Sequence, residues 1–194
     1  MTRPRLVVLL SGGGRTLLNL VAAIEQGRLQ AEIVKVISSR RDAAGVSRAR
    51  AAGLDVEVLR PRDFPDAAAF AAAQTQALLA ARPDLVIMAG YLVHYPVPAA
   101  LAGRILNIHP SLLPRHGGQG LYGEHVHAAV LAAGDRESGC TVHVVDDEYD
   151  HGPIVAQARV AVRPGDSVET LAARVFEAEC ALYPQAIADY LAAR

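Results

Sequence analysis

Asn107 and His109 bring a side-chain amide and an imidazole to the end of one apolar segment, Arg104–Ile108. That segment is predicted to be a strand, and residues two apart on a strand point to the same side. Pro110 and Pro114 stiffen the exit from it. An amide donor stabilises oxygen charge in a tetrahedral state, and an imidazole donates and relays protons near neutral pH. The pair therefore predicts acyl-type group transfer.

An acidic segment, Asp146 to Asp150, is followed by His151-Gly152-Pro153. A carboxylate that faces an imidazole favours its charged form and fixes its orientation. The sequence leaves open which of these acids reaches His109. A solvated turn between two strands is the plain alternative.

A glycine-rich loop, Ser11-Gly12-Gly13-Gly14-Arg15-Thr16, follows the apolar run Leu6–Leu10 and opens a predicted helix. Glycines let backbone N–H groups approach an anion at the positive end of a helix. Arg15 adds a charge and Thr16 a hydroxyl. These residues predict phosphate binding, with a simple tight turn as the alternative.

The same loop departs from two nucleotide-binding patterns. A dinucleotide fingerprint needs a third glycine where Leu17 stands and an acid near Ser38-Ser39-Arg40-Arg41, and the Walker pattern is absent. The Arg40-Arg41 pair suits a 2′-phosphate, so an NADP-type oxidoreductase stays open as an alternative function.

Three further features of the sequence have residue types that can bind a ligand or a metal. Glu179 shares a predicted helix face with the apolar Val175 and Tyr183, so it needs a partner, either a ligand or a structural ion pair. The sequence His125-Val126-His127 places its two imidazoles on different helix faces, and no metal site is expected. Cys140 and Cys180 make no disulfide framework and fit a reducing compartment.

Composition narrows the class of protein. The chain has 194 residues, 52% of them hydrophobic, and 19 basic against 20 acidic residues. This balance disfavours nucleic-acid and membrane-surface binding, and no apolar run is long enough to span a bilayer. We expect a cytoplasmic protein with one domain over residues 1–194.

Short apolar runs alternate with Ala-rich amphipathic segments. This pattern predicts an α/β fold, a Rossmann-like three-layer sandwich with a mostly parallel sheet and an antiparallel element near the C-terminal edge. The last helix is expected to break or kink at Tyr183-Pro184. The predicted strands are Leu6–Leu10, Ile33–Ser38, Val56–Leu59, Leu85–Ala89, Arg104–Ile108, Cys140–Val145 and Ile154–Val162. The predicted helices are Thr16–Gln26, Ala43–Ala52, Asp66–Ala81, Tyr122–Ala133 and Ser167–Arg194.

The string Asn107-Ile108-His109-Pro110-Ser111-Leu112-Leu113-Pro114 resembles the signature of the folate-dependent formyltransferases. Further landmarks resemble the phosphoribosylglycinamide formyltransferase family in order and spacing from about Leu6 to Leu191. They include Ser11-Gly12 through Thr16, Ile37-Ser38 with Gly45, Ala89-Gly90-Tyr91, Gly134-Asp135 and Val142-His143. The chain length also favours this family over the longer formyltransferases that act on methionyl-tRNA and over the formyltetrahydrofolate hydrolases.

The resemblance implies formyl transfer from 10-formyltetrahydrofolate to the amine of glycinamide ribonucleotide in purine biosynthesis, without a metal. It implies catalytic roles for His109, Asn107 and Asp150. It assigns phosphate and ribose contacts to the glycine loop and to Glu179. Implied folate contacts are Leu92, Val93, His94, Tyr95, Asn107 and Asp147. The protein is expected to be a monomer or a homodimer.

Some positions depart from the family pattern. Val93 stands where relatives carry a basic residue, and Ala67 stands where they carry an arginine that helps to bind folate; Arg60 or Arg62 is an alternative for that arginine. The segment Gly117–Gly123 is longer than usual and glycine-rich, which is typical of a lid. These departures keep open another formyl acceptor, either a different amine or water.

Overall fold

The strands, in chain order, are β1 (Arg5–Leu10), β2 (Glu32–Ser38), β3 (Val56–Val58), β4 (Leu85–Met88), β5 (Ile105–His109), β6 (Glu137–Val144) and β7 (Ile154–Ala161). Their order across the seven-stranded sheet of this computed structural model, which describes residues 3–194, is β3-β2-β1-β4-β5-β6-β7. The chain divides into two compact units, one ending at Leu106 and one starting at Asn107.

The helices are α1 (Arg15–Glu25), α2 (Ala44–Ala51), α3 (Ala67–Ala80), α4 (Glu124–Ala132) and α5 (Val168–Ala192). Two 3₁₀ helices that the sequence did not predict, η1 (Pro61–Asp63) and η2 (Ala99–Leu101), complete the set. Within residues 3–194, no helix combines the length and hydropathy that a bilayer span requires.

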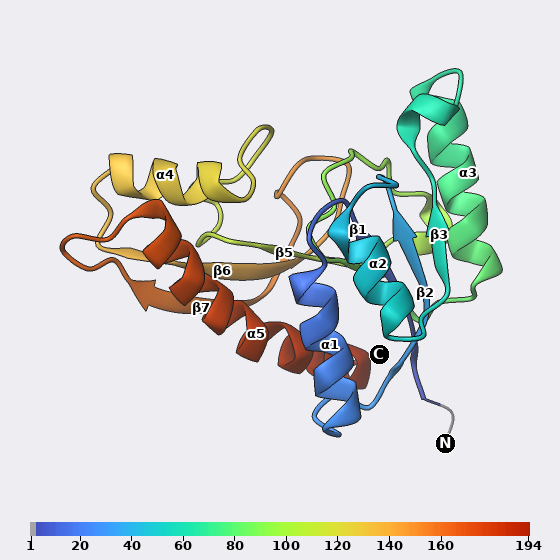
Figure 1. Ribbon diagram of the computed structural model, residues 1–194, viewed down its shortest axis with the longest axis horizontal. Coiled ribbons are helices and arrows are strands. Elements are labelled where there is room, and N and C mark those ends of the chain that lie inside the picture. Colours follow the sequence, from blue (N-terminus) through green and yellow to red (C-terminus); the bar gives the residue numbers. More distant parts are fainter. Residues whose placement is uncertain (1–2) are drawn as a thin grey trace. The chain divides into compact units, whose positions relative to one another are not determined.

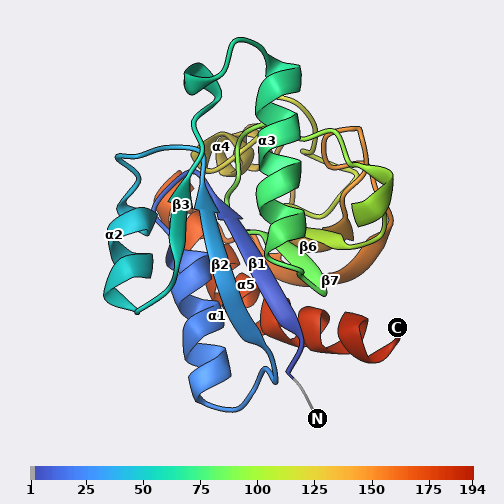
Figure 2. The same ribbon diagram turned by 90° about the vertical axis from the view of Figure 1, so that its right-hand side faces the viewer.

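In the first unit, β1 pairs in parallel with both β2 and β4, and β2 pairs in parallel with β3. Figures 1 and 2 show α1 and α2 on one face of these strands and α3 on the other. This follows from right-handed crossovers that run outward from β1 to β3 and then back to β4. Residues 6–10 of β1 are fully buried because both faces are covered.

In the second unit, β6 and β7 form the antiparallel element that the sequence predicted. Helix α5 packs against both of these strands and also contacts α4 (Figure 1). It begins with a capping box, in which the side chains of Ser167 and Thr170 each accept a hydrogen bond from the other residue's backbone N–H. The α/β class and the mostly parallel sheet are thus confirmed.

The sequence predicted that the last helix would break or kink at Tyr183-Pro184, and the break is absent. Helix α5 is not broken, but runs continuously from Val168 to Ala192 with Pro184 inside it. Proline has no N–H to donate, so one helical hydrogen bond is missing there. Tyr183 and Pro184 are both buried on the packed face, and this burial offsets the lost bond. Other element boundaries differ from the prediction by a few residues.

Candidate active site

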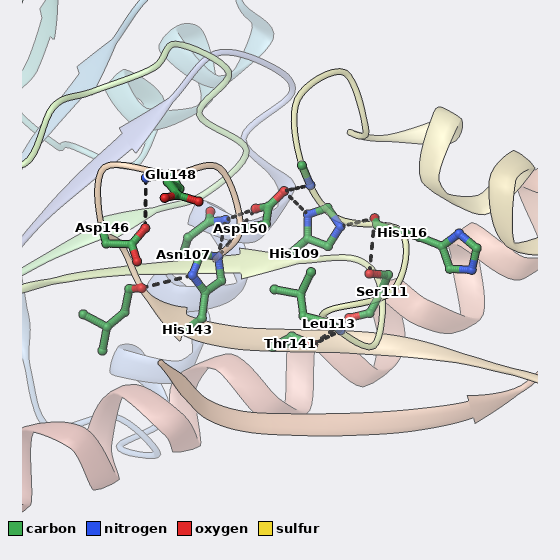
Figure 3. A network of polar contacts seen from close by, with 12 residues as sticks. Asn107, His109, Ser111, Leu113, His116, Thr141, His143, Asp146, Glu148 and Asp150 are labelled. Atoms are coloured by element: carbon green, nitrogen blue, oxygen red, sulfur yellow. Dashed lines mark hydrogen bonds and ion pairs between the residues drawn. The ribbon is translucent and has the colours of Figure 1, made fainter. Parts of the chain in front are cut away.

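The three predicted catalytic residues meet in the second unit. Strand β5 carries Asn107 and His109, and Asp150 comes from the loop between β6 and β7. Figure 3 shows the Asp150 carboxylate between the imidazole of His109 and the amide of Asn107. Its Oδ2 lies 3.3 Å from His109 Nδ1, and its Oδ1 lies 3.4 Å from Asn107 Nδ2. Among the acids of that loop, Asp150 is therefore the one that reaches His109.

His109 is buried, and acceptors face both of its ring nitrogens. Nδ1 faces the carboxylate of Asp150, and Nε2 lies 2.8 Å from the carbonyl oxygen of His116. A carbonyl only accepts, so Nε2 carries a hydrogen in this contact. A protonated ring would donate to both partners at once. The His116 carbonyl must move before Nε2 can reach any other acceptor.

Asp150 is held as a carboxylate by its surroundings. Burial by itself would raise its pKa, but the hydrogen bond from His109 and the charge of that imidazole outweigh burial and hold the pKa well below its usual range. The backbone N–H of Gly118 also donates to Oδ2, over 3.0 Å. The backbone of Asp150 has a φ of 54°, a left-handed conformation that few residues other than glycine adopt.

The segment that contacts His109 and Asp150, residues 116–118, belongs to the glycine-rich stretch singled out in the sequence. His116 also has a left-handed φ of 54°, and its Nε2 lies 2.6 Å from Asp135 Oδ2. A Cβ on Gly117 would clash with the side chain of Leu113 and lie 3.2 Å from Cβ of Asp150. A larger residue at this position must therefore push Leu113 aside and press on Asp150.

A buried polar network supports the turn that follows β5. Thr141 Oγ1 donates to the carbonyl of Ser111 over 2.7 Å and accepts from the N–H of Leu113 over 3.0 Å. The Ser111 hydroxyl donates to the carbonyl of Arg115 over 2.7 Å. These bonds fix the chain between β5 and the 116–118 segment. Sequence reasoning did not find Thr141, because a threonine in an alternating strand has no distinguishing pattern.

His143 is the main site residue that sequence reasoning missed, since the sequence marks it only as part of a family landmark. Its Nε2 lies 3.1 Å from Asn107 Nδ2 and 3.6 Å from Asp150 Oδ1. The signal was the alternation along β6. Residues 141 and 143 share one side of a strand, and both serve the site.

The glycine loop in the first unit has the geometry of a tight turn into a helix. Gly14 is the N-cap of α1 with a φ of 72°, and no side chain caps that helix end. A Cβ on Gly14 would lie 2.7 Å from Cα of Gly45. The backbones at these two positions thus approach each other closely, which explains why the family landmark at position 45 is a glycine. Arg48 from α2 donates to the carbonyl of Gly13 over 2.5 Å. Arg15 is exposed and Thr16 half-buried.

The predicted folate segment, residues 92–95, begins beside that loop. The Leu92 N–H donates to the Ser11 hydroxyl over 2.9 Å, and Ser11 Oγ lies 2.6 Å from Ser39 Oγ. Leu92 and His94 are exposed and Val93 is half-buried. Tyr95 is buried, with its hydroxyl 2.7 Å from Thr75 Oγ1, so it anchors the segment to α3.

Arg60, one of the two possible substitutes for the missing basic residue, is held by Asp63 through two hydrogen bonds. Asp147 is exposed in the acidic loop.

Glu179 and His127 are both buried in the second unit. Glu179 is 8% exposed and lies on the packed face of α5 with Val175 and Tyr183, as the helical spacing predicted. His127 is 5% exposed and its Nδ1 has no hydrogen-bond partner. Burial, and then the charge of His109, lower the pKa of His127. Burial raises the pKa of Cys140 to about 12, as expected for a small buried hydrophobe.

Within residues 3–194, no three His, Cys, Asp or Glu side chains are grouped so as to hold a metal ion. The polar groups in the second unit are instead suited to donating hydrogen bonds to a developing negative charge and to moving a proton.

Comparison with known proteins gives the family. Residues 4–187 match the model of the formyl transferase family. The phosphoribosylglycinamide formyltransferase of Escherichia coli (strain K12) is 38% identical over 185 residues, which are 94% of this chain and 84% of that protein. The solved structure of phosphoribosylglycinamide formyltransferase from Brucella melitensis is 43% identical, with a TM-score of 0.89 over 98% of this chain and 97% of that one.

Some relatives are much longer. The trifunctional purine biosynthetic protein adenosine-3 of Drosophila pseudoobscura pseudoobscura is 41% identical over 190 residues, which are 96% of this chain but 14% of that protein. The chain thus spans about one seventh of such relatives, whereas it matches most of the E. coli protein. Because the family model spans most of its length, the chain belongs to the formyl transferase family.

Proposed function

We propose that this chain transfers a formyl group from 10-formyltetrahydrofolate to the amine of glycinamide ribonucleotide, a step of purine biosynthesis, and that residues 1–194 act as one formyltransferase domain. The observation that carries the proposal is the contact of Asp150 with both His109 and Asn107 at the end of β5. The names of the E. coli and B. melitensis relatives support the same acceptor.

In the first step, the lone pair of the acceptor amine attacks the formyl carbon. The π electrons of the C=O bond move to oxygen and give a tetrahedral oxyanion. An N–H of Asn107 and an N–H of protonated His109 donate to that oxygen. The carboxylate of Asp150 stabilises the imidazolium, because a fixed negative charge faces it across 3.3 Å.

In the second step, the bond between the formyl carbon and N10 of the folate breaks, and its electron pair goes to N10. The attacking amine loses a proton, and N10 gains one by way of His109 or a water molecule. His109 Nε2 is available for both steps only once the His116 carbonyl, now 2.8 Å away, has moved aside. We therefore assign the Gly117–Gly123 segment the role of a lid.

The other proposed contacts follow the family pattern. Gly13, Gly14, Arg15 and Thr16 bind the substrate phosphate at the uncapped N-terminus of α1. Glu179 binds ribose hydroxyls. The folate contacts are Leu92, Val93, His94, Asp147 and Asn107, with Tyr95 holding its segment in place through Thr75.

The test is formyl transfer from 10-formyltetrahydrofolate, measured with and without glycinamide ribonucleotide. We expect folate product to form only when the ribonucleotide is present, and the formylated ribonucleotide to accumulate in equal amount. A panel of other amines and a water-only control examine the alternative acceptors. Equal turnover without the ribonucleotide would overturn the proposed acceptor.

We further propose that the protein acts in the cytoplasm, as a monomer or a homodimer. The two free cysteines fit a reducing compartment. Light scattering of the purified protein, with and without substrates, measures the oligomeric state directly.

A further inference from the structure

His143 lies where β6 departs from regular pairing. The register with β7 shifts between Val142 and His143: Val142 pairs with Ala156 and His143 with Ile154, so the extra residue, Val155, is on β7. The imidazole is 2% exposed and lies against Asn107 and Asp150 (Figure 3). Its place in the fold therefore directs a buried ring at the amide that we assign to the oxyanion.

The hydrogen bonds of His143 determine which ring nitrogen carries the proton. Nδ1 lies 3.1 Å from the carbonyl oxygen of Val144. Because a carbonyl only accepts, Nδ1 is the protonated nitrogen, and the neutral ring has its lone pair on Nε2. Asn107 Nδ2 lies 3.1 Å from that lone pair and donates to it.

The two acceptors near the Asn107 amide nitrogen lie too close together for its two hydrogens to point straight at both of them. Asn107 Nδ2, His143 Nε2 and Asp150 Oδ1 are separated by 3.1, 3.4 and 3.6 Å, a nearly equilateral triangle. Its angle at Nδ2 is far smaller than the angle between the two hydrogens of a planar amide. When one N–H points along the shorter contact, to His143 Nε2, the second N–H therefore cannot also point straight at Asp150 Oδ1.

We propose that His143, as the neutral Nδ1–H tautomer, is the positioning residue that keeps the nitrogen of the Asn107 amide, rather than its oxygen, toward the reacting formyl group. This rests on the proposed function. Without an acceptor at Nε2, only the longer contact with Asp150 Oδ1, over 3.4 Å, opposes a half-turn of the half-buried amide. Its oxygen would then face the developing oxyanion and repel it.

The kinetic test uses His143→Leu, which removes the acceptor, and His143→Gln, whose Oε1 can replace Nε2. We expect His143→Leu to lower kcat at least about tenfold, a fraction of the full loss of an oxyanion donor, with little change in either KM. His143→Gln should recover most of that loss. His151→Leu, an exposed histidine of the neighbouring loop, serves as the control for histidine removal.

A double-mutant cycle separates this role from a structural one. In an Asn107→Ala background, His143→Leu should change kcat by no more than about twofold, because the amide that it orients is already gone. Equal losses in both backgrounds would overturn the proposal, as would a His143→Gln variant that is no more active than His143→Leu.

A measurement independent of turnover is the ¹⁵N NMR spectrum of the imidazoles, with His143→Gln used for assignment. We expect the neutral ring of His143 to carry its hydrogen on Nδ1. A hydrogen on Nε2 would refute the positioning role even in a fully active enzyme. If the wild-type protein failed to transfer formyl at all, the proposed function would fail while this spectrum still reported on the tautomer.

Discussion

The carboxylate of Asp150 lies 3.3 Å from Nδ1 of His109, on a backbone that is held at a φ of 54°. A left-handed aspartate costs conformational energy, and it persists only where its surroundings fix it. Here the N–H of Gly118, the ring of His109 and the amide of Asn107 supply that constraint. The strain lies in the residue that orients the catalytic imidazole.

Asp150→Asn should therefore abolish most activity without preventing folding. The amide keeps the shape of the carboxylate but removes the charge that stabilises the imidazolium. We expect kcat to fall by at least about 100-fold, the lower range of what a positioned acid or base contributes. Steady-state kinetics with both substrates saturating measures this loss. Glu148→Gln, an exposed acid of the same loop, should keep activity close to wild type.

The same substitution should change how stability depends on pH. The folded-state pKa of Asp150 lies below its value in the unfolded chain, so this group stabilises the fold above the unfolded pKa, about 4. That contribution is lost as the pH falls toward the folded-state pKa. Denaturant unfolding from pH 6 to pH 3 should show a shallower decline for Asp150→Asn than for wild type. Parallel declines would mean that Asp150 has no lowered pKa.

Gly117→Ala tests the contact between the glycine-rich segment and the catalytic carboxylate. A Cβ there would clash with Leu113 and press on Asp150, and a displacement of about 1 Å at a catalytic group can cost about 100-fold in rate. We expect kcat to fall between about tenfold and 100-fold. Gly120→Ala has open space around its Cβ and a φ of 89°, so it reports the effect of backbone strain alone. Equal losses in both variants would argue against the contact.

The strands and helices could be predicted because their residue patterns are local. Residues 6–10 and 85–88 are apolar without interruption. Such short continuous runs are typical of strands that are covered on both faces of a parallel sheet. The pairing of Asn107 with His109 also follows from strand periodicity alone. The choice of Asp150 needed the family resemblance, because four acids share the loop and their order along the chain does not say which one reaches the imidazole.

Two features of the site could not be predicted because they depend on tertiary contacts. The contact of His143 with Asn107 and Asp150 joins β6 to β5 and to the loop after β6, and no local residue pattern marks it in advance. The His116 carbonyl reaches His109 because His116 adopts a left-handed backbone and its side chain pairs with Asp135. The predicted break at Pro184 was wrong for a related reason. Burial of one face of α5 is a tertiary effect, and it stabilises a helix that continues past a residue that usually ends one.

Gly45→Ala, a substitution in α2, tests how closely that helix must pack against the glycine loop. The new Cβ would lie 2.8 Å from the Gly12 carbonyl oxygen and 2.9 Å from Leu10, so the loop must shift. We expect the KM for the ribonucleotide to rise about tenfold, equivalent to about 1.4 kcal/mol, while kcat changes little. The strain should also lower the free energy of unfolding by about 1–3 kcal/mol. Ser47→Ala, an exposed position on the same helix, is the matched control.

His127 should make the protein less stable as the pH falls below neutrality. Its ring is 5% exposed, and burial together with the charge of His109 lowers its pKa in the folded state below the unfolded value of about 6.5. Below that pH the unfolded chain binds a proton that the folded chain does not, so the free energy of unfolding declines. His127→Leu should remove this decline, whereas His125→Leu, at an exposed position of α4, should keep it. Urea unfolding at pH 7.5 and pH 5.5 decides the question, and equal losses in wild type and His127→Leu would show that the ring takes up a proton within the fold.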